Sequence, residues 1–125
     1  MDKQKMIVNN IFTEKERTWL NFILKQDFEG KEKTIDYINT LTTEEIIRDY
    51  SNYHKIIEFR TRYINQGYSG MSEMVSVQTI HNDGSTPTVF TLYAKDGFPF
   101  EYEIYNADSS AIDDTIILDG ELYIG

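Results

Sequence analysis

The stretch from His81 to Asn106, HNDGSTPTVFTLYAKDGFPFEYEIYN, decides the fold. At its centre lies Asp96-Gly97, a dipeptide typical of a two-residue type I′ turn, because both central residues of this turn have positive φ. Apolar and aromatic residues on both sides of the dipeptide indicate two strands. Asn82-Asp83-Gly84-Ser85 predicts a second turn just upstream. We therefore expect a β-hairpin on which the rest of the chain packs.

A regular two-residue turn also predicts the register of this hairpin. The face that we expect to point into the core carries three cross-strand pairs: Tyr93/Phe100, Thr91/Tyr102 and Val89/Ile104. The opposite face carries two: Leu92/Glu101 and Phe90/Glu103. Pro99 has no N–H to donate and is expected opposite Ala94.

The length and composition indicate a single domain, residues 1–125, with one hydrophobic core. The chain has no cysteine, which excludes disulfides, thiolate metal sites and a cysteine nucleophile, and this fits a reducing compartment. The longest apolar run near the start, Met6-Ile7-Val8, is too short for a signal peptide or a membrane span. We expect a cytoplasmic, soluble protein that does not enter a membrane.

The net charge of −9 is concentrated in the second half of the chain. Acidic and basic residues balance within residues 1–40 and within residues 41–62, whereas residues 63–125 hold ten acidic residues and one basic residue, Lys95. Such a surface repels nucleic-acid phosphates and anionic lipid and attracts a basic protein or a cation. An alternative explanation is that the excess of acidic residues only keeps the protein soluble.

Two helices are predicted before the hairpin. The first begins at a capping box, Thr13-Glu14-Lys15-Glu16, and continues with an apolar stripe at helical spacing: Trp19, Leu20, Ile23 and Leu24. We expect four of its polar side chains to face solvent: Glu16, Arg17, Lys25 and Gln26. After Gly30, a second helix is predicted from Lys31 to about Thr40, with Ile35 and Ile38 pointing inward.

The stretch from Thr42 to Arg62 fits either a helix or two strands. Thr43-Glu44-Glu45-Ile46 is able to open a helix, whereas Ile57, Phe59 and Thr61 alternate with charged residues, as in a half-buried strand. Ser51-Asn52-Tyr53-His54 has the composition of a turn, which favours a strand hairpin.

Further strands are predicted from Met74 to His81 and, as one strand or a short hairpin, within residues 111–124. The predicted fold class is α+β. Residues 1–41 form a layer of two helices, which packs on a mainly antiparallel meander sheet of about five strands, residues 42–125.

Three ordered motifs resemble a family of small uncharacterised bacterial proteins known only as a domain of unknown function. The first motif runs from Phe12-Thr13-Glu14-Lys15-Glu16-Arg17 to Asp27-Phe28-Glu29-Gly30, the second from Asp83 to Pro87, with Thr86 inserted, and the third from Asp96-Gly97 to Glu101-Tyr102-Glu103-Ile104. The resemblance covers most of residues 11–118 and implies a strand hairpin after the second helix. This chain departs from the family at Asn52-Tyr53-His54, where the family often has a Cys-Gly-Cys turn. Because no activity is established for the family, the resemblance implies a fold and no chemistry.

The sequence offers little for catalysis or metal binding. His54 and His81 have no ligands at metal-binding spacing, no Gly-x-Ser-x-Gly elbow occurs, and we expect neither a cofactor nor a metal. Glu101 and Glu103 are the strongest candidates for acid/base chemistry, because residues two apart on a strand lie on one face at roughly 6.5–7 Å. The alternative function is therefore a small hydrolase or sugar-binding domain that uses these glutamates.

The favoured function is a non-enzymatic protein-interaction module for a basic partner, comparable to toxin-immunity and phage-encoded inhibitor proteins. Aromatic and apolar groups ringed by carboxylates are typical of a protein-binding patch. The predicted binding residues are Phe90, Leu92, Glu101, Glu103, Tyr105, Asp108, Asp113 and Asp114. In a second arrangement the two helices cover this face and the glutamates lie only at its rim. The sequence specifies no oligomeric state.

The charge distribution generates a first prediction: the protein does not bind nucleic acid at physiological salt. Phosphate contacts require clustered Lys and Arg, and residues 63–125 offer only Lys95. Mobility-shift assays with duplex and single-stranded DNA and RNA test this. Sub-micromolar binding to any of them would contradict the prediction.

Overall fold

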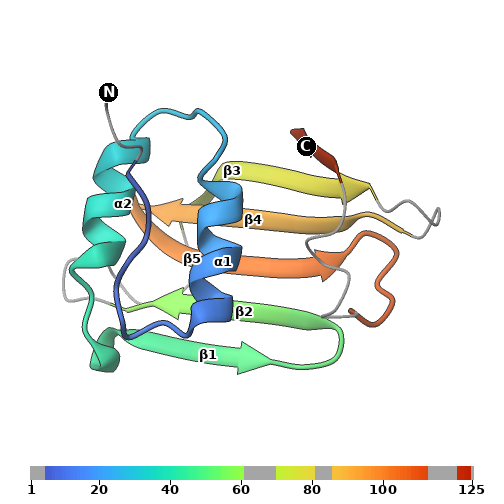
Figure 1. The fold of residues 1–125 in the computed structure, drawn as a ribbon, viewed down its shortest axis with the longest axis horizontal. Coiled ribbons are helices and arrows are strands. Elements are labelled where there is room, and N and C mark those ends of the chain that lie inside the picture. The colour runs from blue at the N-terminus through green and yellow to red at the C-terminus, as the bar shows by residue number, and fades with distance from the viewer. Residues whose placement is uncertain (1–4, 61–69, 81–85, 113–120, 125) are drawn as a thin grey trace.

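The computed structural model describes residues 5–60, 70–80, 86–112 and 121–124. Within these ranges two α-helices lie on one face of a six-stranded antiparallel sheet (Figure 1). The elements in chain order are α1 (Glu14–Ile23), α2 (Lys31–Asn39), a 3₁₀ turn η1 (Thr43–Glu45), β1 (Ile46–Tyr50), β2 (His54–Phe59), β3 (Met71–Ile80), β4 (Thr88–Lys95), β5 (Phe98–Asn106) and β6 (Glu121–Ile124). No helix in these ranges is long and apolar enough to span a bilayer. The α+β fold class is confirmed.

The strand order is β1-β2-β5-β4-β3-β6, and every pairing is antiparallel. Strands β3, β4 and β5 form a meander. The β1–β2 hairpin joins the free side of β5, and β6 joins the free side of β3. The chain therefore crosses from β2 to the far side of the meander before it returns strand by strand. As a result, β1 is an outer strand of the sheet.

Helix α1 begins as its capping box predicts. The Glu16 N–H donates to the Thr13 hydroxyl at 3.1 Å, and the Thr13 N–H donates to the Glu16 carboxylate at 2.8 Å. The predicted stripe is buried against the sheet: Trp19, Leu20, Ile23 and Leu24. The Tyr102 hydroxyl of β5 donates to the Trp19 carbonyl at 2.6 Å, so a buried hydrogen bond also joins α1 to the sheet.

Helix α2 begins at Gly30, which has φ of +81°, and places Ile35 and Ile38 in the core as predicted. Between the helices runs a segment that the sequence analysis did not assign, residues 5–12, here called the strap (Figure 1). The side chain of Asn21 in α1 accepts the Ile7 N–H at 2.7 Å and donates to the Ile7 carbonyl at 3.0 Å. Asn39 in α2 accepts the Val8 N–H at 2.9 Å. The helical layer is thus held together through the strap.

The favoured hairpin interpretation of residues 44–62 is confirmed for the part that is described. A single 3₁₀ turn precedes β1, and β1 pairs with β2 from Ile46/Phe59 to Tyr50/Lys55. The strand predicted from Met74 begins three residues earlier, at Met71. The turn predicted at residues 82–85 lies outside the described residues.

The register predicted for the β4–β5 hairpin is wrong beyond its first pairs. Asp96 and Gly97 have φ of +53° and +83°, as a type I′ turn requires, and Pro99 lies opposite Ala94. A β-bulge then inserts Phe100, so that Tyr93 pairs with Glu101 instead of with Phe100.

The bulge changes which β4 side chains enter the core. Leu92 pairs with Tyr102 and Phe90 pairs with Ile104, and all four side chains are buried beneath the helices. Thr91 pairs with Glu103 on the opposite face. The predicted β5 face is therefore correct, whereas the predicted β4 face is reversed.

A second prediction concerns the turn. Because Gly97 has φ of +83° and a Cβ at this position meets nothing within 4 Å, substitution there costs backbone strain alone. We expect Gly97→Val to lower the free energy of unfolding by about 1–3 kcal/mol. Gly97→Asn should cost clearly less, because asparagine tolerates the left-handed region. Urea unfolding of both variants measures the difference, and equal costs would contradict the strain argument.

Candidate functional site

The sheet face that points away from the helices carries two of the carboxylates predicted to be functional, Glu101 and Glu103. A row of cross-strand neighbours runs over it: Glu58 on β2, Glu101 on β5, Tyr93 on β4 and Glu73 on β3. Glu103 and Tyr105 follow Glu101 on the same side of β5 because side chains alternate along a strand. We call these six residues the acidic face.

The acidic face is covered to different degrees along its length. Glu58 and Glu101 are only 7% and 6% exposed, although they lie directly opposite each other. Arg60 forms an ion pair with one of these two glutamates, because its Nε lies 3.2 Å from the Glu58 carboxylate. Glu103 is half-buried and Glu73 is exposed. Contact with a macromolecule therefore involves Glu103 and Glu73 before Glu101.

Tyr93 shows the electrostatic character of this face. Burial raises the pKa of its hydroxyl, and the neighbouring charges of Glu103, Glu101 and Glu73 raise the pKa further. Loss of the proton from the Tyr93 hydroxyl would add a further negative charge beside these carboxylates, which is unfavourable. The ring thus remains a neutral hydrogen-bonding and packing group in an acidic setting.

Two of the predicted binding residues do not belong to this surface. Phe90 and Leu92 are 0% and 1% exposed and pack in the core beneath α1 and α2, on the opposite side of β4 from the glutamates. The prediction that they share a face with Glu101 and Glu103 is therefore wrong, and its cause is the bulge at Phe100. The aromatic members of the face are Tyr93 and Tyr105, which are half-buried.

The remaining predicted residues lie toward one end of β5 or beyond the described part. Tyr105 lies between His54 on β2 and Val89 on β4. Asp108, in the loop after β5, is exposed and accepts the Ser110 N–H at 2.9 Å. Hydrogen bonds from Ser110 lower the pKa of Asp108. Asp113 and Asp114 lie outside the described residues.

Histidine does not form a metal centre in the described part of the chain. The Nε2 atom of His54 lies 3.6 Å from the Asp49 carboxylate, and no group of three or more His, Asp or Glu side chains in the described ranges is arranged to hold a metal ion. His81 lies outside these ranges.

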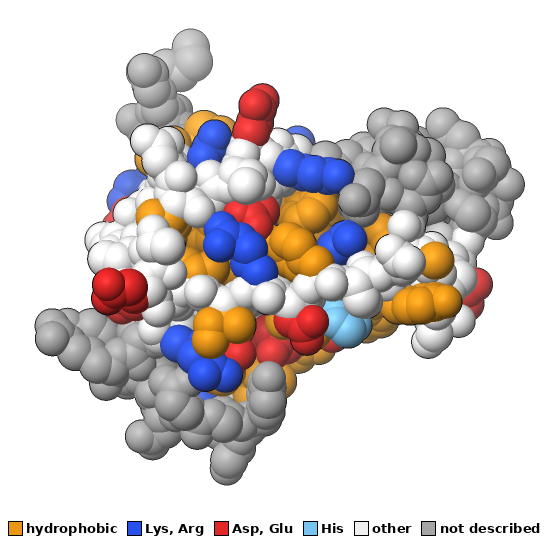
Figure 2. Space-filling model, turned by 90° about the horizontal axis from the view of Figure 1, so that it is seen from below, with side chains coloured by type: hydrophobic (Ala, Val, Ile, Leu, Met, Phe, Trp, Pro, Cys, Tyr) orange, Lys and Arg blue, Asp and Glu red, His pale blue; other side chains and the backbone are white. Residues whose placement is uncertain are grey.

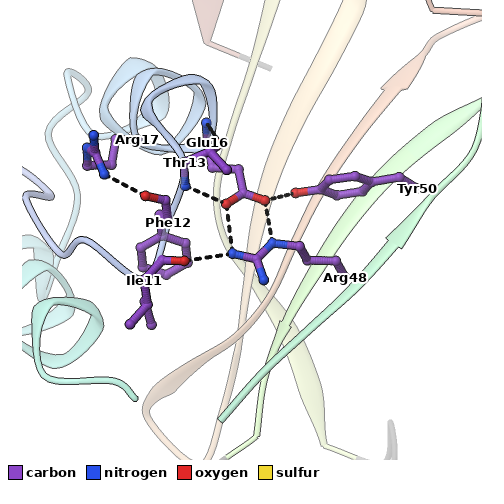
Figure 3. A network of polar contacts seen from close by, with 7 residues as sticks. All are labelled: Ile11, Phe12, Thr13, Glu16, Arg17, Arg48 and Tyr50. Carbon is purple, nitrogen blue, oxygen red and sulfur yellow. Dashed lines mark hydrogen bonds and ion pairs between the residues drawn. The ribbon is translucent and has the colours of Figure 1, made fainter. Parts of the chain in front are cut away.

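A polar cluster that the sequence analysis missed connects α1 to β1 (Figure 3). Glu16 is only 2% exposed, so its predicted place in solvent is wrong. Its carboxylate accepts hydrogen bonds from the Nε of Arg48 at 2.5 Å and from a terminal nitrogen of the same guanidinium at 2.8 Å. It also accepts a hydrogen bond from the Tyr50 hydroxyl. A further N–H of Arg48 donates to the Ile11 carbonyl of the strap at 2.9 Å. One carboxylate therefore links helix, strand and strap.

The cluster shifts the protonation of its members. Burial acts to raise the pKa of Glu16, but the hydrogen bonds from Arg48, Tyr50 and the Thr13 N–H outweigh it, and the pKa lies below its ordinary value. Burial, followed by the hydrogen bond to Glu16, raises the pKa of the Tyr50 hydroxyl. Glu16 is therefore ionised and Tyr50 neutral at physiological pH. This arrangement stabilises structure and leaves no group positioned to exchange protons.

Comparison with known proteins assigns no family or function to this chain. No family model, curated protein or solved structure matches this chain. The function is therefore inferred from the geometry and charge of the described residues.

A third prediction follows from the Glu16 cluster. Glu16→Gln keeps the capping geometry but removes the charge, and we expect it to lower the free energy of unfolding by about 1–3 kcal/mol at neutral pH. Because the pKa of Glu16 is lowered in the folded state, its contribution is present above the ordinary glutamate value of about 4.3 and is lost as the pH falls below it.

The two proteins should therefore approach equal stability in acid, which urea unfolding between neutral and acidic pH measures. Glu14→Gln, an exposed change in the same helical turn, serves as the control and should alter stability by less than about 0.5 kcal/mol. A difference between wild type and Glu16→Gln that persists unchanged in acid would contradict the ion-pair argument.

Proposed function

We propose that this protein is a non-enzymatic interaction module that binds a basic partner protein, in the manner of immunity or inhibitor proteins. The observation that supports the proposal is the acidic face. Its four glutamates lie on β2, β5 and β3, and β4 runs between the last two of these strands. Negative charges gathered on one surface raise the rate of association with a positively charged protein and orient that protein as it approaches.

Two aromatic side chains give this surface more than charge. Tyr93 and Tyr105 are half-buried and lie beside Glu101 and Glu103, on the same side of the sheet. Tyrosine is enriched at the centres of protein interfaces because it buries a large ring and retains a hydroxyl for hydrogen bonding. These two rings, and not the buried side chains of Phe90 and Leu92, are the aromatic groups that this surface offers to a partner.

The second candidate function remains a small hydrolase or sugar-binding domain that uses Glu101 and Glu103. Both glutamates lie on one face of β5, and Glu101 is far more buried than Glu103. Two carboxylates in unequal surroundings are a known arrangement for a catalytic acid and its partner. The interaction proposal is favoured because the acids extend over several strands and are not confined to one pocket.

A fourth prediction tests this proposal with charge reversals. The double variant Glu73→Lys/Glu103→Lys should lose a basic partner that wild-type protein retains from a lysate of the source cells. The matched control Glu29→Lys/Glu32→Lys makes the same charge change at exposed positions just before and at the start of α2, and should retain the partner. With the purified partner, surface plasmon resonance should show a lower association rate for the first variant, with a deficit that shrinks as salt rises.

Thermal unfolding shows whether both variants remain folded. Equal retention by both variants would contradict a role for the acidic face. Hydrolysis of a small glycoside by the protein alone, abolished by Glu101→Gln or Glu103→Gln, would replace the interaction proposal with the second candidate.

A further inference from the structure

The outer strand β1 presents backbone groups that another strand is able to use. At one end of the β1–β2 hairpin the Ser51 N–H donates to the His54 carbonyl at 2.9 Å, and at the other the Arg60 N–H donates to the Glu45 carbonyl at 2.6 Å. Hydrogen-bonded pairs alternate along an antiparallel ladder, so Ile47 and Asp49 direct their backbone groups to β2. The N–H and C=O groups of Arg48 and Tyr50 consequently point outward from the sheet.

Two of the usual means of protecting such an edge, a bulge and a proline, are missing from β1. Its pairing with β2 has no bulge, it contains no proline, and residues 47–50 are all exposed. Among the described residues, no backbone hydrogen bond reaches the outward groups of Arg48 and Tyr50. Large apolar side chains are exposed along the same hairpin, with 39% of Ile47 and 60% of Tyr53 accessible.

The charge of Arg48 does not prevent pairing at this edge. An inward-pointing charge on an edge strand commonly blocks a further strand, because the new neighbour would bury it without a partner. Here the guanidinium already binds the Glu16 carboxylate through two nitrogens. A neighbouring strand therefore covers a neutralised pair.

A basic notch lies beside the edge on the helical side of the sheet. It has a volume of about 330 Å³. Its lining consists of Lys15, Lys55, the paired side chains of Arg48 and Glu16, Thr13, and the rings of Trp19 and Tyr50. The Lys15 ammonium lies 5.6 Å from the centre of the Trp19 ring, and that of Lys55 lies 5.7 Å from the centre of the Tyr50 ring. Figure 2, which views the molecule from the β1 side, shows Lys and Arg side chains among hydrophobic ones over the middle of this surface.

We infer that the β1 edge binds an extended acidic segment of a partner protein as an added strand, with a carboxylate side chain entering the basic notch. Main-chain hydrogen bonds to Arg48 and Tyr50 supply the affinity, and the notch supplies the preference for Asp or Glu. This site is separate from the acidic face. The acidic face binds a basic partner, whereas the β1 edge binds an acidic segment.

Charge also disfavours a second copy of this chain as the occupant. Two β1 strands related by a two-fold axis place both helical layers on the same side of the joined sheet. The basic notches of the two copies, with Lys15 and Lys55, then lie near each other. Like charges at such close range weaken the pairing.

The experiment uses the whole protein and two end-blocked eight-residue peptides. One alternates threonine and glutamate, and the other alternates threonine and lysine. We expect the glutamate peptide to bind at least about tenfold more tightly in calorimetric titrations. Lys15→Glu/Lys55→Glu should remove this preference, whereas Lys25→Glu/Lys33→Glu, the same charge change at exposed positions elsewhere, should retain it.

Amide hydrogen exchange tests the edge itself. The Arg48 and Tyr50 amides should exchange rapidly in the unbound protein and slow by about tenfold or more with the glutamate peptide, whereas the Asp49 amide is protected throughout. The proposal is overturned if no binding occurs up to about 1 mM peptide, if both peptides bind equally, or if binding leaves these two amides unprotected. Protection of both amides without peptide, in a protein that sediments as a dimer, would assign the edge to a second copy instead.

Discussion

The single extra residue at the β4–β5 bulge determines which side chains face the helices. Phe100 has no partner of its own on β4, and beyond it the two strands are shifted by one residue relative to a regular hairpin. Because side chains alternate with a period of two, this shift brings Leu92 and Phe90 onto the same side as Tyr102 and Ile104. On β4 and β5, the core and the acidic face are therefore two consequences of one irregularity. On β3, a second register shift between Glu73 and Val75 places these two residues on opposite faces.

Local signals in the sequence predicted most of the elements. The capping box at Thr13, the stripe from Trp19 to Leu24 and the Asp96-Gly97 turn depend on residues close together in the chain, and the structure confirms them. The prediction of the register was wrong because it continued the regular pairing from the turn along both strands and assumed no bulge. The sequence held a clue, since regular pairing sets Leu92 against Glu101 and Phe90 against Glu103, whereas a shift of one residue pairs apolar with apolar.

Contacts between distant segments could not be predicted in this way. Glu16 was assigned to solvent because a charged residue in the first turn of a helix is usually exposed, and its partner Arg48 lies 32 residues away in an element of uncertain type. The bonds of Asn21 to the strap also join residues that are not local, because they span 14 residues. In the candidate site, Glu101, Glu103 and Tyr105 share a face as alternation along one strand predicts, whereas Phe90 and Leu92 of β4 were misplaced.

The ion pair between Glu16 and Arg48 explains how one small domain keeps two surfaces of opposite charge. Glu16 is a capping residue, so its carboxylate is fixed at the start of α1, and it draws Arg48 toward the helical side of β1. The guanidinium is thereby held away from the acidic face, where it would cancel carboxylates. Glu16 in turn is fully engaged by Arg48, Tyr50 and the Thr13 N–H, so it adds little negative charge to the notch beside Lys15 and Lys55. The pair that stabilises the edge strand thus also preserves the separation of charge on which both proposed surfaces depend.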